Sequence, residues 1–187
     1  TLAGTWFFSR QGETLPRHKR RPFSFKQFYL SSKFILTHAT VMGYTFAMAG
    51  IFGSFLAYLS ASQTIFQVYY GVGDMFPYIF AVLAFSIGLA SYFNGTMVMK
   101  FGMRRLCRFA LKGVNGFAVV YLALLLAYDG LPPLVLTVVT MFVGFFFVGI
   151  LFGNLNALAM QPLGGMAGLG AALIGSLSSL FSVPIAL

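Results

Sequence analysis

Three long stretches of this sequence contain no Lys, Arg, Asp or Glu, and they limit what the chain can fold into. These stretches are 34–73, 75–99 and 130–187. The last has 58 residues and, as a single helix, would be about 87 Å long at ~1.5 Å per residue. A bilayer core is only ~30 Å thick, which about 20 helical residues cross. We therefore expect the last stretch to cross a membrane and turn back once.

The shortage of charge applies to the whole chain. Charged residues make up 8% of it, whereas a soluble domain carries about a quarter. Such a chain cannot cover a water-facing surface, so the predicted fold class is an all-α membrane protein. Residues 1–8 are expected to end a preceding transmembrane helix, and residues 9–33 to form a basic linker. About five transmembrane spans follow, at 34–59, 76–99, 109–128, 134–155 and 166–187.

The positions of the basic residues predict how the spans are oriented. The linker before the first span holds seven Lys and Arg, and the region between the second and third spans, together with the start of the third, holds five. The loops after the first and third spans hold none, and each carries one Asp. Because cytoplasmic loops are enriched in Lys and Arg, the linker is predicted to be cytoplasmic and the protein multi-pass. Orientation explains the net charge of +9, so the expected partner is the lipid bilayer and not a nucleic acid.

Small residues recur at helical spacing in several spans. Glycines that stand in these stripes are predicted to let helices pack closely, which in lipid is a main source of helix association. One interpretation is a rigid bundle, and another is a smooth seam along which helices rock or slide. The predicted packing positions are Gly43, Gly50, Gly168 and Gly175.

Polar side chains inside the spans are few. Asn154 and Asn156 stand at the cytoplasmic end of the fourth span, where helix-terminal hydrogen bonding and substrate contact are both open. His38 stands in the inner half of the first span, as a satisfied interfacial histidine or as a proton carrier. Intramembrane polar groups usually face protein or a water-filled path.

The spans lack the residues that intramembrane catalysis requires. No acid lies within a span, and His38 is the one histidine there, so neither a Ser–His nor an Asp–Asp pair is available. A lone Cys107 excludes a disulfide framework and a cysteine metal cluster. We therefore predict no catalytic residue, no metal, no cofactor and no enzymatic activity.

Between the second and third spans, the chain from Gly95 to Arg105 reads GTMVMKFGMRR. This resembles the G-x-x-x-D-x-x-G-R-[KR] loop of the major facilitator superfamily, with Met99 at the position of the acid. The segments 52–77 and 152–168 look like helices seven and eight, and the junction of helices ten and eleven, of bacterial drug:proton antiporters of the Bcr/CflA type.

The resemblance implies a partial six-helix half-bundle of the major facilitator fold, truncated before its last helix and partnered by an N-terminal six-helix half. It implies a secondary active transporter of the bacterial inner membrane, in which proton-coupled multidrug efflux proceeds by alternating access and the proton gradient supplies the energy. A same-fold transporter of a metabolite or siderophore, and a non-transporting membrane scaffold, are the alternatives. The resemblance gives a cytoplasmic gate loop with Gly95, Gly102, Arg104 and Arg105, and candidates for a cavity that binds a small, possibly apolar drug: Tyr44, Met48, Asn154 and Asn156.

Overall fold

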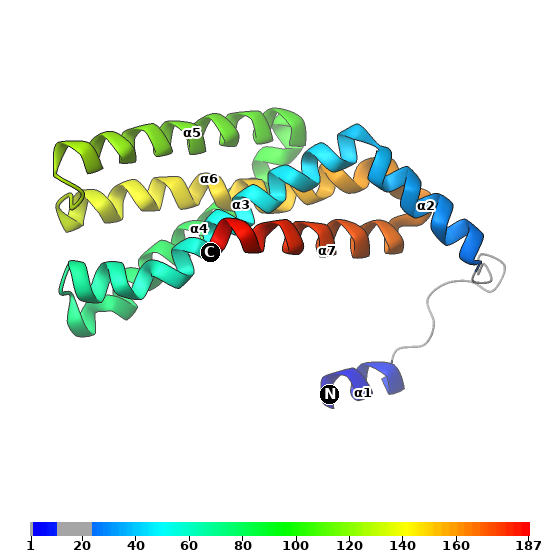
Figure 1. Cartoon of the computed structure of the whole chain (residues 1–187), viewed down its shortest axis with the longest axis horizontal. Coiled ribbons are helices and arrows are strands. Elements are labelled where there is room, and N and C mark those ends of the chain that lie inside the picture. Colours follow the sequence, from blue (N-terminus) through cyan, green and yellow to red (C-terminus); the bar gives the residue numbers. More distant parts are fainter. Residues whose placement is uncertain (1, 11–23) are drawn as a thin grey trace.

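The computed structural model describes residues 2–10 and 24–187, and this part of the chain is helical without a strand. Two shorter helices come first, α1 (Leu2–Arg10) and α2 (Phe25–Thr37). Five long helices follow (Figure 1): α3 (Ala39–Gln63), α4 (Phe76–Phe101), α5 (Met103–Ala127), α6 (Leu134–Met160) and α7 (Ala167–Ala186). The fold class predicted from the charge-free stretches is thus confirmed.

By length and composition, four helical stretches of the described residues could cross a membrane. The longest, Leu134–Ala186, has 53 residues and contains both α6 and α7. A 3₁₀ segment, Gln161–Met166, separates these two helices, and Leu163 within it has non-helical angles (φ −105°, ψ 19°). The chain turns back there, so that α6 and α7 run in opposite directions (Figure 1). The expectation that this stretch turns back once is confirmed.

The helices begin and end at other residues than the predicted spans do. The first span was predicted to begin at Phe34, but residues 34–37 belong to α2 and the chain is extended at His38 (φ −79°, ψ 104°). The nitrogen Nδ1 of His38 accepts a bond from the Val41 backbone N–H at 3.4 Å, which caps α3. His38 therefore has the structural role of an N-cap, and its ring packs at 5.2 Å from that of Phe34. Beyond Gln63, a π-helical turn extends the helix to Tyr69.

The central helix of the bundle is α6. It packs against α3, α4 and α5, whereas α7 packs mainly along α3 (Figure 1). Eleven of the 27 residues of α6 are buried, compared with three of the 25 residues of α5. Its neighbours in sequence, α5 and α7, therefore lie on different sides of the bundle, and α6 joins them.

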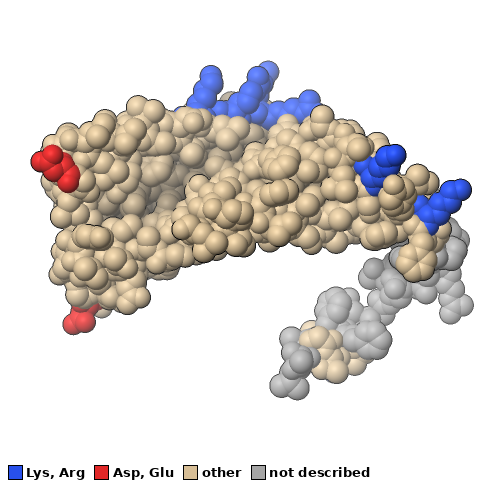
Figure 2. Space-filling view, viewed as in Figure 1, with Lys and Arg blue, Asp and Glu red and all other residues tan. Residues whose placement is uncertain are grey.

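Charges separate to the two ends of the bundle (Figure 2). Asp74 and Asp129 lie in the turns before α4 and before α6, which we call the acidic end. Basic residues gather on α2 and around the α4–α5 turn, which we call the basic end. An apolar surface lies between them and includes exposed side chains such as Phe85, Val119 and Val135. This is the charge distribution of a multi-pass membrane protein.

Close helix contacts occur at glycines outside the predicted set. A Cβ on Gly53 would lie 2.7 Å from Ile185 Cβ of α7, and one on Gly149 would lie 2.8 Å from Ala90 Cβ of α4. Between α5 and α6 the contacts are reciprocal, since Gly113 lies against the ring of Phe147 and Gly144 against that of Phe117.

The four glycines predicted as packing positions do not make such contacts. At Gly43, Gly50, Gly168 and Gly175 an added Cβ would meet nothing within 4 Å, so the prediction needs correction for the described helices. On α3 the buried residues are Val41, Thr45, Ala49, Gly53 and Ser62, which excludes both Gly43 and Gly50. On α3 the face that packs is therefore a different one from the face that carries Gly43 and Gly50.

At the acidic end, Tyr70 links the turn after α3 to the start of α6 by hydrogen bonds. Its hydroxyl donates to Pro132 O at 2.7 Å and also bonds Thr137 Oγ1 at 2.6 Å. We expect Tyr70→Phe to lower the free energy of unfolding by about 1 kcal/mol, since a partly buried hydrogen bond is lost. Thermal unfolding of the purified protein in detergent measures this. Tyr69→Phe is the control because the Tyr69 side chain is 66% exposed; equal losses in the two variants would contradict the role of Tyr70.

Candidate substrate cleft and cytoplasmic loop

The seam between α4 and α6 contains two of the buried polar side chains of the described bundle, Ser86 and Asn154. Asn154 Nδ2 donates to Asn94 Oδ1 of α4 at 2.5 Å and to Ile150 O at 2.8 Å. Farther along, Ser86 Oγ donates to Phe142 O at 2.5 Å. Both amide hydrogens of Asn154 are therefore engaged within the bundle, and the residue is only 3% exposed.

The four predicted cavity residues lie in different surroundings. Asn154 joins α4 to α6, and Asn156 is exposed on α6. Tyr44 and Met48 are partly buried and pack against two core clusters, one around Leu151 and Leu155 and one around Val41 and Ile174. Among the described residues, these four side chains thus do not share one environment, and their part in a substrate cavity stays a prediction. The hydrogen bond of Asn154 joins two helices from within α6, which continues to Met160, and is not the helix-terminal bonding that was predicted. Substrate contact by Asn154 stays a prediction.

A cavity does open elsewhere, where α3, α4 and α6 meet. We call it the aromatic cleft; its volume is about 260 Å³. The lining residues, all apolar apart from one phenol hydroxyl, are Phe55, Tyr58, Leu59, Phe80, Leu83, Ala84, Ile87 and Phe145. Three separate helices contribute to it, which is why no single segment of sequence reveals it.

The rings of the aromatic cleft have defined orientations. Tyr58 meets Phe145 edge to face, with ring centroids 4.6 Å apart and planes at 79°. Tyr58 and Phe80 are nearly parallel, at 12°, with centroids 6.5 Å apart. The buried hydroxyl of Tyr58 has no hydrogen-bond partner among the described residues. A buried polar group without a partner is costly, so this hydroxyl is a natural contact for a bound molecule.

Sequence reasoning missed the aromatic cleft. The chain has 23 Phe and nine Tyr, so no single aromatic residue stands out by its rarity. A usable signal was present in the pairs Phe55–Tyr58 and Phe76–Phe80, because residues three or four apart lie on one helix face. Pairs of this kind on two successive spans would have indicated an aromatic surface shared between them.

The predicted gate loop is a very short turn at the basic end. Gly102 alone separates α4 from α5, with φ 76° and ψ 151°. Arg104 and Arg105 are exposed in the first turn of α5, and an added Cβ on Gly95 would meet nothing within 4 Å. The turn thus presents the two arginines at the surface of the bundle. Its participation in gating remains a prediction.

We expect Gly102→Ala to lower the free energy of unfolding by about 1–3 kcal/mol, because the region φ +76° with extended ψ is almost restricted to glycine. Gly95→Ala is the matched control, since this glycine lies inside α4 and a helical alanine is favoured by about 0.5–1 kcal/mol. The unfolding temperature should therefore fall in Gly102→Ala and rise in Gly95→Ala. A shift of the same sign in both would refute the backbone explanation.

The fold and the aromatic cleft together are those of a multi-pass membrane protein. Long apolar helices with charge at their two ends form a multi-pass membrane bundle with an internal aromatic cleft, and the described residues contain no group of His, Cys, Asp or Glu that could hold a metal ion.

Two known proteins are similar in sequence to this chain. The chain is 29% identical over 172 residues to the "Uncharacterized MFS-type transporter YdgK" of Bacillus subtilis, which covers 90% of this chain and 41% of that protein. It is 29% identical over 180 residues to the "Bicyclomycin resistance protein homolog" of Haemophilus influenzae, covering 94% and 44%. No family model and no solved structure matches the chain. The two relatives confirm the predicted resemblance to major facilitator transporters of the Bcr/CflA type. The chain spans about two fifths of the length of these relatives.

Proposed function

We propose that this chain is part of the C-terminal half of a secondary transporter that exports apolar organic cations from the bacterial cytoplasm. In this proposal, six-helix halves alternate about a central site, and the aromatic cleft is a wall of that site. The names of the two relatives, a transporter and a drug-resistance homolog, support transport as the activity.

The aromatic cleft is the observation that carries the proposal. Aromatic faces attract organic cations, and the attraction strengthens where water is excluded. Tyr58 and Phe80 are nearly parallel at a centroid distance of 6.5 Å. A planar guest held between two rings needs about 3.5 Å on either side, which is slightly more than this centroid distance provides, so the two rings must move apart to admit a flat aromatic cation.

The absence of charge in the aromatic cleft favours this substrate class over the alternatives. None of the residues that line it is charged, whereas an anionic metabolite or siderophore would need basic side chains. The acids of the sequence are Glu13, Asp74 and Asp129, and the two that are described lie at helix ends. We therefore assign proton binding to another part of the longer transporter, with the proton gradient as its energy source.

The test is drug efflux by the full-length protein whose gene contains this sequence. Reconstituted in proteoliposomes with a proton gradient, it should move a planar fluorescent cation against its concentration gradient, and collapse of the gradient should abolish the movement. Equal movement of a neutral analogue would reject the cation preference. No movement of either probe would reject the exporter and leave a scaffold as the better interpretation.

Tyr58→Phe probes the aromatic cleft with two opposite readouts. The variant keeps the ring but removes a buried hydroxyl that lacks a partner, so we expect the substrate-free protein to gain about 1 kcal/mol of stability. Affinity for a cation that bears a hydrogen-bonding group should fall several-fold, while affinity for one without such a group should not change. Loss of stability without a change in affinity would contradict the proposed contact.

A further inference from the structure

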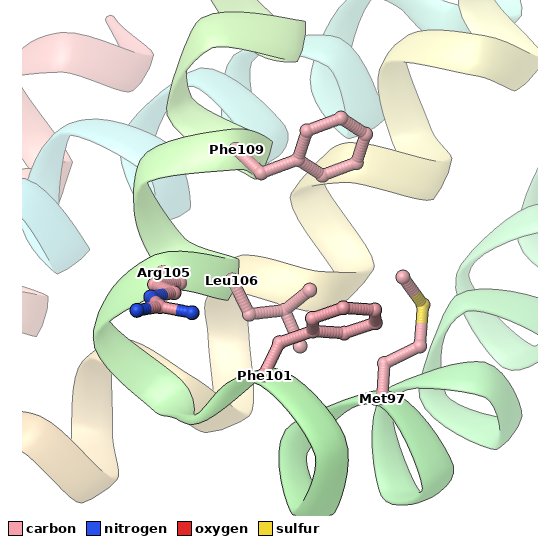
Figure 3. A pocket seen from close by; sticks show the side chains of 5 residues that line it. All are labelled: Met97, Phe101, Arg105, Leu106 and Phe109. Carbon is pink, nitrogen blue, oxygen red and sulfur yellow. The ribbon is translucent and has the colours of Figure 1, made fainter.

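A second cavity opens between α4 and α5 at the basic end (Figure 3). Its volume is about 280 Å³, and we call it the α4–α5 slot. The side chains of Met97, Phe101, Leu106 and Phe109 line it, and Arg105 lies at its rim with the guanidinium group directed away from these four (Figure 3).

The slot exists because α4 and α5 separate directly after their turn. Both helices pack on α6 and make few contacts with each other. Phe101 and Phe109 are each 53% exposed, so the slot opens sideways at the surface of the bundle. On a helix pair that spans a membrane, this surface meets lipid, and its closeness to the turn at Gly102 sets its depth near one membrane surface.

A polar hollow continues the slot. Its volume is about 370 Å³, and it shares Phe101 and Arg105 with the slot. Besides Arg105, two further arginines line the hollow, Arg104 and Arg108. The rest of its lining comes from the α4–α5 turn and from the end of α6: Gly102, Met103, Leu158 and Gln161. An apolar slot and a basic hollow are therefore joined at one pair of residues.

The positive charge of this hollow has no counter-charge in the described part of the chain. The two described acids, Asp74 and Asp129, lie at the opposite end of the bundle. The first turn of α5 contains no acid, and no side chain caps its N-terminus. Since a helix N-terminus is itself positive, arginines placed there repel one another and the helix unless an anion is bound.

We propose that an anionic phospholipid of the leaflet at the basic end binds here. Its phosphate is held in the hollow by Arg104, Arg105 and Arg108, and one acyl chain occupies the α4–α5 slot. A free phosphate would use only the hollow and an apolar drug only the slot, whereas a lipid matches both the apolar lining and the charge. This inference does not depend on the proposed export activity, because the lipid site lies apart from the aromatic cleft.

The experiment measures lipid retention by native mass spectrometry on the full-length protein. The protein is titrated with phosphatidylglycerol or, separately, with phosphatidylcholine of the same chains. We expect phosphatidylglycerol to be retained preferentially, and Arg104→Gln/Arg105→Gln to weaken its binding by roughly fivefold for each arginine removed. Lys26→Gln/Lys33→Gln is the matched control, because it removes two exposed charges of the basic end that lie outside the hollow.

Further arms separate the acyl chain from the phosphate. Met97→Trp fills the slot and leaves the arginines unchanged, so it should reduce the retention of phosphatidylglycerol. Glycerol phosphate at millimolar concentration lacks acyl chains, so it should fail to displace the lipid. The proposal is overturned if Met97→Trp retains the lipid as the wild type does, if glycerol phosphate displaces it, or if the lysine control loses as much binding as the arginine variant. Thermal unfolding of each variant, compared with wild type, verifies that it is folded.

Discussion

Gly149→Val is expected to lower the free energy of unfolding by about 3 kcal/mol, at the upper end of the usual cost of overpacking. A Cβ at this position would lie 2.8 Å from Ala90 Cβ and 3.0 Å from the backbone oxygen of Ile87. The backbone of α4 cannot yield as a flexible side chain does. The two helices must therefore separate at this point, which also strains the hydrogen bond between Asn94 and Asn154 one turn away. The fraction of monodisperse protein that remains after heating in detergent measures the loss.

Gly153→Val on the same helix is the matched control. A Cβ at Gly153 would meet nothing within 4 Å, while the change in backbone freedom and in apolar volume is the same. This variant should unfold close to the wild-type temperature. Similar losses in both variants would show that valine in α6 is harmful by itself, and the contact between α4 and α6 would lose its importance.

Phe80→Leu is expected to weaken binding of a planar organic cation by about 2- to 30-fold, which corresponds to the ~0.5–2 kcal/mol of a cation–π contact. The substitution keeps an apolar side chain in the aromatic cleft but removes the ring that faces Tyr58. Binding of a neutral ligand of similar shape should change much less. Equilibrium titration of the full-length protein with a fluorescent cation and with its neutral analogue measures the difference.

Phe85→Leu supplies the control for this experiment. Phe85 is on the same helix, but it is 63% exposed and does not line the aromatic cleft. The same substitution there should leave both affinities unchanged. If the two variants behaved alike, or if Phe80→Leu weakened the neutral ligand equally, the aromatic cleft would not be a cation site.

Charge and turn signals were sufficient to predict the course of the chain. The charge-free stretch from Gly130 predicted a turn back, and the structure has it at Gln161–Met166. Gly102 was predicted only as a residue of the gate loop, and the structure shows it as the single residue between α4 and α5. These features are local, because they depend on helix length in a bilayer and on the φ that glycine allows.

The packing faces could not be predicted in the same way. In a soluble helix the polar side marks the surface, but a membrane helix is apolar on all sides, so its sequence does not mark the buried face. Gly53 packs against α7 whereas Gly50 does not, although both are glycines of one helix. The difference depends on where α7 lies, which no residue of α3 specifies. The aromatic cleft was missed for the same reason, since it forms only when three helices meet.

The position of α6 also determines when this bundle can assemble. Each of the three long helices that precede it in the chain packs against α6, and α4 makes few contacts with its sequence neighbour α5. During synthesis, α3, α4 and α5 therefore enter the membrane as loosely associated helices. Ordering of this bundle waits for the helix that begins at Leu134. A ribosome stalled before this residue would expose a nascent chain without its central packing partner, and membrane quality-control proteases would have their best access to the protein in that interval.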